Sequence, residues 1–179
     1  MKGIIFIQFT KKVNEVWGED MVEDLIEQAD LDSEGVYTSV GTYCFREMVS
    51  LINVLSKISG TSPADLQKTF GEYLFKQLSM KYPLFLEGKK DLFSFLASLE
   101  NTIHVEVKKL YPEAELPSFE YVFPAENIME MTYRSQRPFA DLAEGLLRGA
   151  VAHFGEKIEL SRQDFPVEKG SKALFRLTK

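Results

Sequence analysis

The sequence predicts an α+β fold, in which an N-terminal helical lobe packs against a four-stranded antiparallel sheet that carries an additional helix. Up to about residue 111 the apolar residues mostly recur at helical spacing. Beyond Pro117 they alternate as in strands, in two pairs that flank one more helix. Because no segment rich in Pro, Gly or Ser separates these parts, we expect one domain over residues 1–179, with a helical lobe at about 1–111 and a mixed lobe at about 112–179.

Helical elements come first along the chain. The clearest of them begins at Ser62, a capping residue that Pro63 follows in the first turn. Its apolar residues recur every four positions, namely Leu66, Phe70, Leu74 and Leu78. Similar spacing predicts the other helices of this lobe at about 4–16, 20–28, 44–57, 91–98 and 100–111.

Four strands are expected in the second lobe, at about 119–123, 128–135, 157–165 and 173–177. Turn-forming residues at 124–127 and 168–171 join the members of each pair, so the pattern predicts two hairpins. Between the hairpins, a helix at about 139–153 has a wide apolar face, which is typical of a helix that is buried on more than one side.

Composition and charge exclude several classes of protein. The 21 basic and 27 acidic residues give a net charge of -6, without the basic footprint of a nucleic-acid-binding protein. The single cysteine, Cys44, excludes an internal disulfide and a cysteine-based metal site, and we expect it to be buried or inert. No segment has the features of a signal peptide or of a membrane-spanning helix, so we expect a cytoplasmic protein with no membrane insertion.

The common catalytic signatures of hydrolases, phosphate-loop proteins, dinucleotide-binding proteins and zinc proteases are missing, and we expect no enzyme activity. Only two histidines are present. His153 lies just before Gly155, where it suits the end of a helix. His104 lies on the shoulder of a predicted buried stripe of Ile103, Val107 and Leu110, from which an imidazole can point inward; spacing alone favours an ordinary boundary histidine.

A polar row closes the second predicted strand. Because Pro138 disfavours helical geometry at Arg137, we expect Tyr133, Ser135 and Arg137 to lie on one face at the end of this strand. A phenol, a hydroxyl and a guanidinium are donors that bind paired carboxylates. The row predicts an anion site, and an ordinary polar face of an edge strand is an equally open interpretation.

Taken together, these residues resemble the heme nitric oxide/oxygen binding family, H-NOX. His104 lies in a helix that ends Lys-Leu-Tyr-Pro, and Tyr133-x-Ser135-x-Arg137 follows it. The opening Met-Lys-Gly-Ile-Ile-Phe and the segments 35–37 (Gly-Val-Tyr) and 143–146 (Ala-Glu-Gly-Leu) also resemble the family. The resemblance covers essentially the whole chain and is to the stand-alone bacterial type.

The resemblance implies a heme b cofactor, iron protoporphyrin IX, bound between the two lobes. His104 would be the proximal iron ligand and would leave the opposite face open for a gas. Tyr133, Ser135 and Arg137 would bind the heme propionates. Pro117 matches a proline that presses against the porphyrin and distorts it.

The resemblance also implies ligand choice. Members that bind dioxygen have a distal tyrosine where this chain has Leu142, and the other matching positions are apolar: Ile5, Phe9, Leu74, Leu78 and Leu146. An apolar pocket offers no hydrogen bond to the partial negative charge of bound dioxygen. We therefore expect a nitric oxide sensor, with carbon monoxide as a second gas ligand. Tyr73 and Gln77 stay open as donors that can turn inward.

The implied output is a conformational switch. Nitric oxide would release His104, and the heme and the helical lobe would relax. The signal would pass to a separate protein, such as a histidine kinase or a cyclic-di-GMP enzyme. The acidic stretch from Glu15 to Glu34 is a possible docking face, although a solvated helix surface is the simpler interpretation. Two alternatives stay open: a heme enzyme of the peroxidase type, and a binding or scaffold domain without heme.

Overall fold

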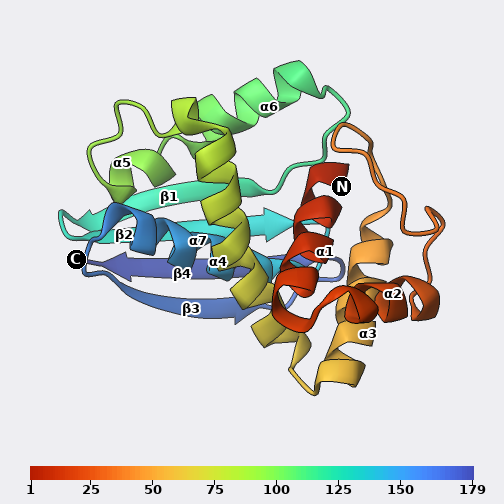
Figure 1. Ribbon diagram of the computed structural model, residues 1–179. Coiled ribbons are helices and arrows are strands. Elements are labelled where there is room, and N and C mark those ends of the chain that lie inside the picture. Colours follow the sequence, from red (N-terminus) through yellow and green to blue (C-terminus); the bar gives the residue numbers. More distant parts are fainter.

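The structure is a computed structural model that describes all residues, 1–179. It has seven α-helices and one four-stranded antiparallel sheet (Figure 1), and the predicted α+β fold is confirmed. The N-terminal part of the chain forms four helices: α1 (Gly3–Trp17), α2 (Glu19–Gln28), α3 (Phe45–Ser59) and α4 (Pro63–Lys81). The start of α4 is as predicted, since the Ser62 hydroxyl accepts a hydrogen bond from the Asp65 amide at 3.1 Å and Pro63 is the first helical residue.

The segment that follows α4 is more broken than the sequence predicts. It contains a 3₁₀ turn, η1 (Pro83–Phe85), a short α5 (Leu92–Leu96), a π-helical turn, η2 (Leu99–Ile103), and α6 (His104–Leu110). The wider π turn arises because the His104 amide donates to the carbonyl of Leu99, five residues earlier. The predicted burial of Leu110 is wrong, since 68% of this residue is exposed at the free end of α6.

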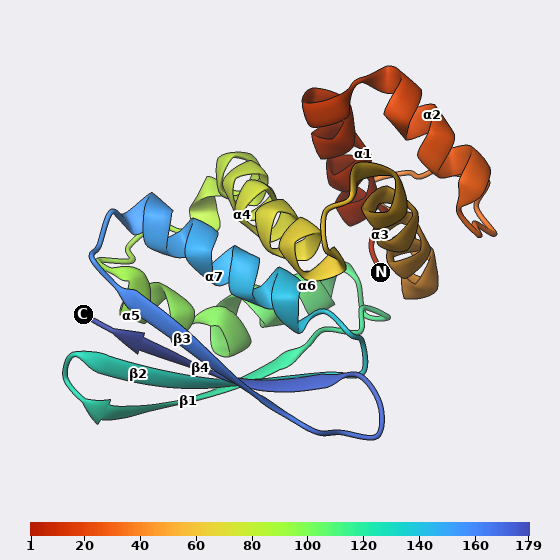
Figure 2. The ribbon, with the colours of Figure 1, turned by 90° about the horizontal axis from the view of Figure 1, so that it is seen from below.

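Two hairpins form the sheet, as predicted. Its strands are β1 (Ser118–Ala125), β2 (Ile128–Ser135), β3 (Glu159–Phe165) and β4 (Ser171–Thr178), in the spatial order β1-β2-β4-β3. Between the hairpins, α7 (Ala140–Phe154) runs across one face of the sheet, and Figure 2 shows that no helix covers the other face. The inward-facing side chains of β2 and β4 are fully or nearly fully buried: Met129, Met131, Tyr133, Ala173, Phe175 and Leu177.

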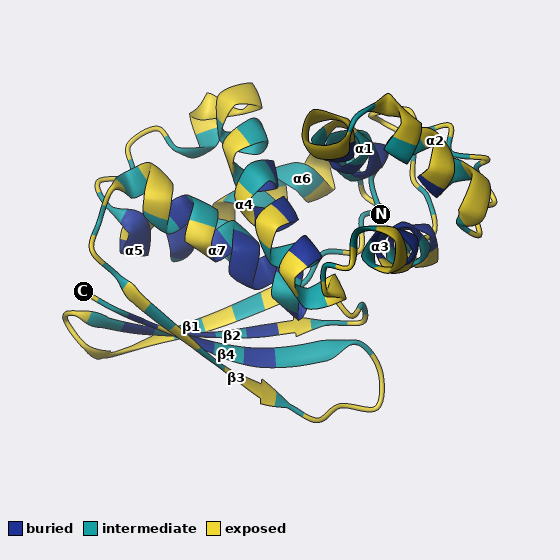
Figure 3. Cartoon of the chain, turned by 60° about the horizontal axis from the view of Figure 1, so that its bottom comes forward, coloured by how far each residue is buried: buried dark blue, intermediate teal, exposed yellow.

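The buried hydrophobic residues form two clusters of fourteen. One lies among α1 to α4 and also takes in Phe139 and Leu142, and the other lies between the sheet, α5 and α7. Figure 3 shows both clusters on the faces that the elements turn toward one another. The α5 residues belong to the cluster of the sheet, although α5 precedes the sheet in sequence. The two clusters adjoin where α4 crosses α7, and Gly71 and Gly145 permit this close approach, since a Cβ on either glycine would lie within 3 Å of backbone atoms of the other helix.

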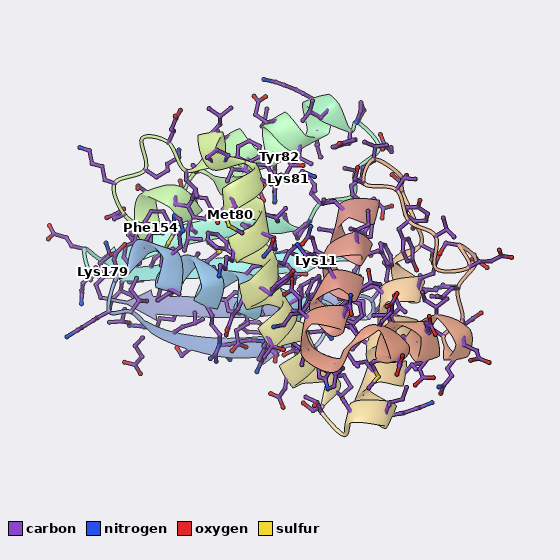
Figure 4. All side chains as sticks on the ribbon, in the orientation of Figure 1. Lys11, Met80, Lys81, Tyr82, Phe154 and Lys179 are labelled. Carbon is purple, nitrogen blue, oxygen red and sulfur yellow. The ribbon has the colours of Figure 1, made fainter.

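The C-terminus and the end of α7 lie at the same end of the molecule, where Figure 4 labels Lys179 and Phe154. Lys179 forms an ion pair there with Glu156, at 2.9 Å. Cys44 precedes α3 and is exposed, so the thiol that we expected to be buried or inert is not buried. None of the helices is both long enough and apolar enough to span a membrane.

Candidate functional site

His104 is the first residue of α6, directly after the π turn. Only 15% of its side chain is exposed. The Nδ1 atom lies 3.1 Å from Oε1 of Glu100, and Nε2 has no hydrogen-bond partner. Burial lowers the pKa of His104, although the Glu100 carboxylate acts in the opposite direction. A neutral imidazole with one nitrogen anchored and the other free is the form in which histidine binds a metal.

Aromatic rings connect His104 to the sheet. The ring centroid of Phe119, on β1, is 5.7 Å from that of His104 and 5.6 Å from that of Tyr133, on β2. Phe119 and Tyr133 are also register partners in the antiparallel pair. Phe119 therefore brings two of the predicted site residues to one region of the molecule.

The predicted polar row is present in part. Tyr133 is 3% exposed, and burial raises the pKa of its phenol. Strand β2 ends at Ser135, so the prediction that Arg137 extends the strand is wrong. The chain bends there because the Ser135 hydroxyl accepts a hydrogen bond from the Arg137 amide at 3.1 Å.

The Arg137 guanidinium is positioned by groups outside the strand. Only 14% of its side chain is exposed, and it forms an ion pair of 2.9 Å with Glu115, whose side chain is 78% exposed. It also lies 5.7 Å from the ring centroid of Phe45. The guanidinium thus already binds a carboxylate, and that carboxylate comes from the exposed segment that leads to Pro117, the residue before β1.

The six predicted distal residues lie in one apolar region, although they come from three helices. Three of them are core members of the first buried cluster, and the other three are partly buried against it: Phe9, Leu74 and Leu142, then Ile5, Leu78 and Leu146. All six side chains are aliphatic or aromatic hydrocarbons, so none of them can donate a hydrogen bond. The cluster also includes the partly buried tyrosines Tyr37, Tyr43 and Tyr73.

Tyr73 and Gln77, the two possible hydrogen-bond donors to a bound gas, differ in their contacts. The Tyr73 hydroxyl donates to Glu15 at 3.0 Å, and burial together with this carboxylate raises the pKa of Tyr73 to about 12. The Tyr73 hydroxyl is therefore already hydrogen-bonded to a side chain of α1. Gln77 is partly buried, and it stays open as a donor.

Two groups that attach the segment around α6 to the rest of the molecule were missed by the sequence interpretation. Glu100 lies four residues before His104, the helical spacing at which side chains meet, and this spacing was the available signal. Lys2 was missed because its partners are distant in sequence. Its Nζ atom lies 2.9 Å from Oγ1 of Thr42, 3.0 Å from Oε1 of Glu113 and 3.9 Å from the centroid of the Tyr111 ring.

Other parts of the molecule do not compete for this role. His153 is exposed at the end of α7, between the rings of Phe75 and Phe154, as expected of a helix-terminal histidine. A surface pocket of about 270 Å³ lies between the start of α7 and the turn of the second hairpin, and none of the predicted site residues lines it. Its Arg162 pairs with Asp141 and Asp164, both at 2.7 Å.

The donor set fits heme. No group of three or more His, Cys, Asp or Glu side chains is placed to hold a bare metal ion. A single imidazole with a free Nε2 suits an iron whose other ligands come from a macrocycle. A largely shielded guanidinium that already binds a carboxylate suits a propionate.

Comparisons with known proteins identify the family. The haem-NO-binding family model matches residues 2–162. The unliganded Fe(II) H-NOX protein from K. algicida is 41% identical, with a TM-score of 0.93 over 100% of this chain and 96% of that chain. The H-NOX from Shewanella woodyi, solved in the Fe(II)CO state, is 36% identical, with a TM-score of 0.85 over 100% and 94% of the two chains. The H-NOX protein from S. oneidensis, solved in the Fe(II)NO state, is 29% identical, with a TM-score of 0.90 over 99% and 98%.

No curated protein sequence matches the chain. The family model nevertheless covers most of its length, and the likeness to solved structures covers all of it. H-NOX domains bind heme and are sensors rather than enzymes. On these findings, the chain belongs to the H-NOX family of heme-based gas-sensing domains.

Proposed function

We propose that this protein is a nitric oxide sensor that carries heme b and selects against dioxygen. The observation that carries the proposal is the distal cluster, by which we mean Ile5, Phe9, Leu74, Leu78, Leu142 and Leu146. These side chains are aliphatic or aromatic, and none of them can donate a hydrogen bond. Selection against dioxygen would follow because this surface has no hydrogen-bond donor.

Dioxygen and nitric oxide differ in what they require from such a surface. Bound dioxygen carries partial negative charge, and a hydrogen bond from the protein stabilises it. Nitric oxide and carbon monoxide bind ferrous heme without that help. The structures of H-NOX proteins from S. oneidensis with nitric oxide and from S. woodyi with carbon monoxide support both gases as ligands in this family.

Residues from both lobes would hold the cofactor. His104 would ligate the iron through Nε2, Pro117 would press on the porphyrin, and Tyr133, Ser135 and Arg137 would bind the propionates. When bound, the iron supplies the coordination position for the gas. Arg137 would exchange the exposed carboxylate of Glu115 for a propionate, which requires no new charge in the pocket.

We expect His104 to detach from the iron when nitric oxide binds opposite it. The segment that contains His104 is suited to move, because no residue from 97 to 117 is buried. Lys2 joins α1 to Tyr111 and Glu113, just beyond α6, so a shift of α6 would reach the helical lobe. The receiver would be a separate effector, with a histidine kinase or a cyclic-di-GMP enzyme as the candidates.

An absorption experiment tests this proposal. The purified protein is reduced under nitrogen and then exposed separately to air and to nitric oxide. We expect a ferrous heme spectrum that is unchanged in air and that converts to the five-coordinate nitrosyl form with nitric oxide. A stable oxy spectrum would contradict the proposed selectivity, and the absence of heme after reconstitution would contradict the sensor function itself.

A further inference from the structure

Glu100 makes two contacts through one oxygen atom. Its Oε1 atom lies 3.1 Å from Nδ1 of His104 and accepts a hydrogen bond of 2.7 Å from the backbone amide of Phe119. The two partners belong to different elements, α6 and β1. One carboxylate therefore connects the predicted iron ligand to the edge strand of the sheet.

The π turn η2 provides the local geometry for this connection. Glu100 lies inside η2, and His104 follows its last residue. Two-thirds of the Glu100 side chain is shielded from solvent, and 15% of the His104 side chain is exposed. Hydrogen bonds to a carboxylate are stronger in such a partly desolvated environment than in water.

We infer that Glu100 is a positioning residue that sets the orientation and the electron donation of His104. An ionised carboxylate can only accept hydrogen bonds, so Nδ1 must carry the proton and Nε2 must present its lone pair. A carboxylate acceptor on the far nitrogen also makes an imidazole a stronger metal ligand. The inference rests on the proposed function, and it adds that Glu100 sets how readily His104 leaves the iron.

The second contact of Glu100 gives the release of His104 a direct route to the sheet. If His104 moves, the oxygen that it shares with the Phe119 amide must move with it or lose one of the two bonds. Phe119 packs on Tyr133, so the change would reach β2 as well as β1. Glu100 thus couples the proposed iron ligand to β1 and, through Phe119, to Tyr133 on β2.

Two substitutions and one matched control test the inference in the heme-loaded protein. Glu100→Gln keeps a neutral acceptor, and Glu100→Leu removes it. Glu106→Gln is the control, because Glu106 lies on α6 but pairs with Lys109 at 2.6 Å. The readouts are the iron–histidine stretching frequency of the reduced protein, the rate of conversion to the five-coordinate nitrosyl form, and the hydrogen-exchange rate of the Phe119 amide.

We expect the stretching frequency to fall in Glu100→Gln and to fall further in Glu100→Leu. Conversion with nitric oxide should become about tenfold faster, in line with the usual effect of removing such a partner of a metal ligand. The Phe119 amide should exchange faster in Glu100→Leu, and Glu106→Gln should match the unsubstituted protein in all three readouts.

An unchanged stretching frequency in heme-loaded Glu100→Gln and Glu100→Leu would overturn this inference and leave the proposed function intact. Equal shifts in Glu106→Gln would also overturn it, because the effect would then belong to any loss of charge on this segment. An unsubstituted protein that takes up no heme would overturn the proposed function, and this inference with it.

Discussion

The two sides of the proposed heme site are built from different kinds of interaction. The distal cluster lies within or against the buried core of the helical lobe. The other side is the proximal segment, residues 91–117, which has no buried residue after Leu96. Only its start, α5, belongs to the core of the sheet, and Leu99 and Ile103 are partly buried against that core. Beyond Leu96 its directed attachments are polar contacts: Glu100 with Phe119, Lys2 with Glu113, and Glu115 with Arg137.

The difference separates selectivity from signalling. Packing within a core is collective and tolerates little displacement, so the distal cluster is suited to keep one shape and one polarity. A segment that is held by a few directed bonds can move when one of them changes. The distal side would therefore choose the gas, and the proximal side would report that the gas is bound.

The largest expected effect comes from removing the proposed proximal ligand. His104→Gly should abolish the five-coordinate ferrous spectrum, because no other histidine lies near the site, and added imidazole should restore it. His153→Ala is the matched control and should leave the spectrum unchanged, since His153 is exposed at the end of α7. A variant that kept the ferrous spectrum without imidazole would show that another residue ligates the iron.

The next effect tests the distal side. Leu142→Tyr should make dioxygen binding detectable in air, because a hydrogen bond to a charged acceptor contributes about 1.5–3 kcal/mol, or roughly 10- to 150-fold in affinity. Leu142 is 8% exposed, so the larger ring is expected to reduce the free energy of unfolding by about 1–3 kcal/mol. Leu142→Phe adds the ring without the hydroxyl. If both variants bound dioxygen equally, volume and not the donor would control selectivity.

The fold was largely predictable from the sequence, but less so in the proximal segment than elsewhere. Regular apolar spacing predicts the long helices, because α1, α3 and α4 each bury one face and α7 buries side chains in both clusters. Alternating apolar residues predict all four strands. The proximal segment was predicted less well. Its short elements, α5, η2 and α6, depend on individual hydrogen bonds, such as that from the His104 amide to Leu99, which leave no periodic pattern.

The candidate site likewise contains residues that the sequence predicts and contacts that it does not. The distal residues were identified from matching positions, and the structure brings them together in one cluster. The contacts of Lys2 with Tyr111 and Glu113 join positions more than a hundred residues apart, and nothing in the local sequence indicates them. Arg137 was placed on a strand by the rule for residues before proline, which does not include the competing hydrogen bond of Ser135.

The smallest expected effect concerns the start of the proximal segment. Asp91 caps α5 by accepting a hydrogen bond from the Ser94 amide at 2.8 Å, and it pairs with Lys179 at 2.9 Å. The Lys179 hydrogen bond and then the Ser94 amide lower the pKa of Asp91 to about 2. Because this pKa is lower in the folded than in the unfolded chain, the stabilisation is complete above about pH 4 and is lost as the pH falls toward 2.

Asp91→Asn keeps a capping oxygen and removes the charge, so it should lower the free energy of unfolding by about 0.2–1 kcal/mol at pH 7, the range of exposed ion pairs. Urea unfolding at pH 7 and near pH 2.5 should show this difference narrow as the carboxylate of the unsubstituted protein is protonated. Lys179→Met is the companion variant and should weaken the pH dependence without removing the cap. A difference that stayed constant over this pH range would mean that the charge of Asp91 does not stabilise the folded chain. The start of the proximal segment would then be held by the cap and by the buried side chains of α5, and its contrast with the distal cluster would be smaller than the polar contacts indicate.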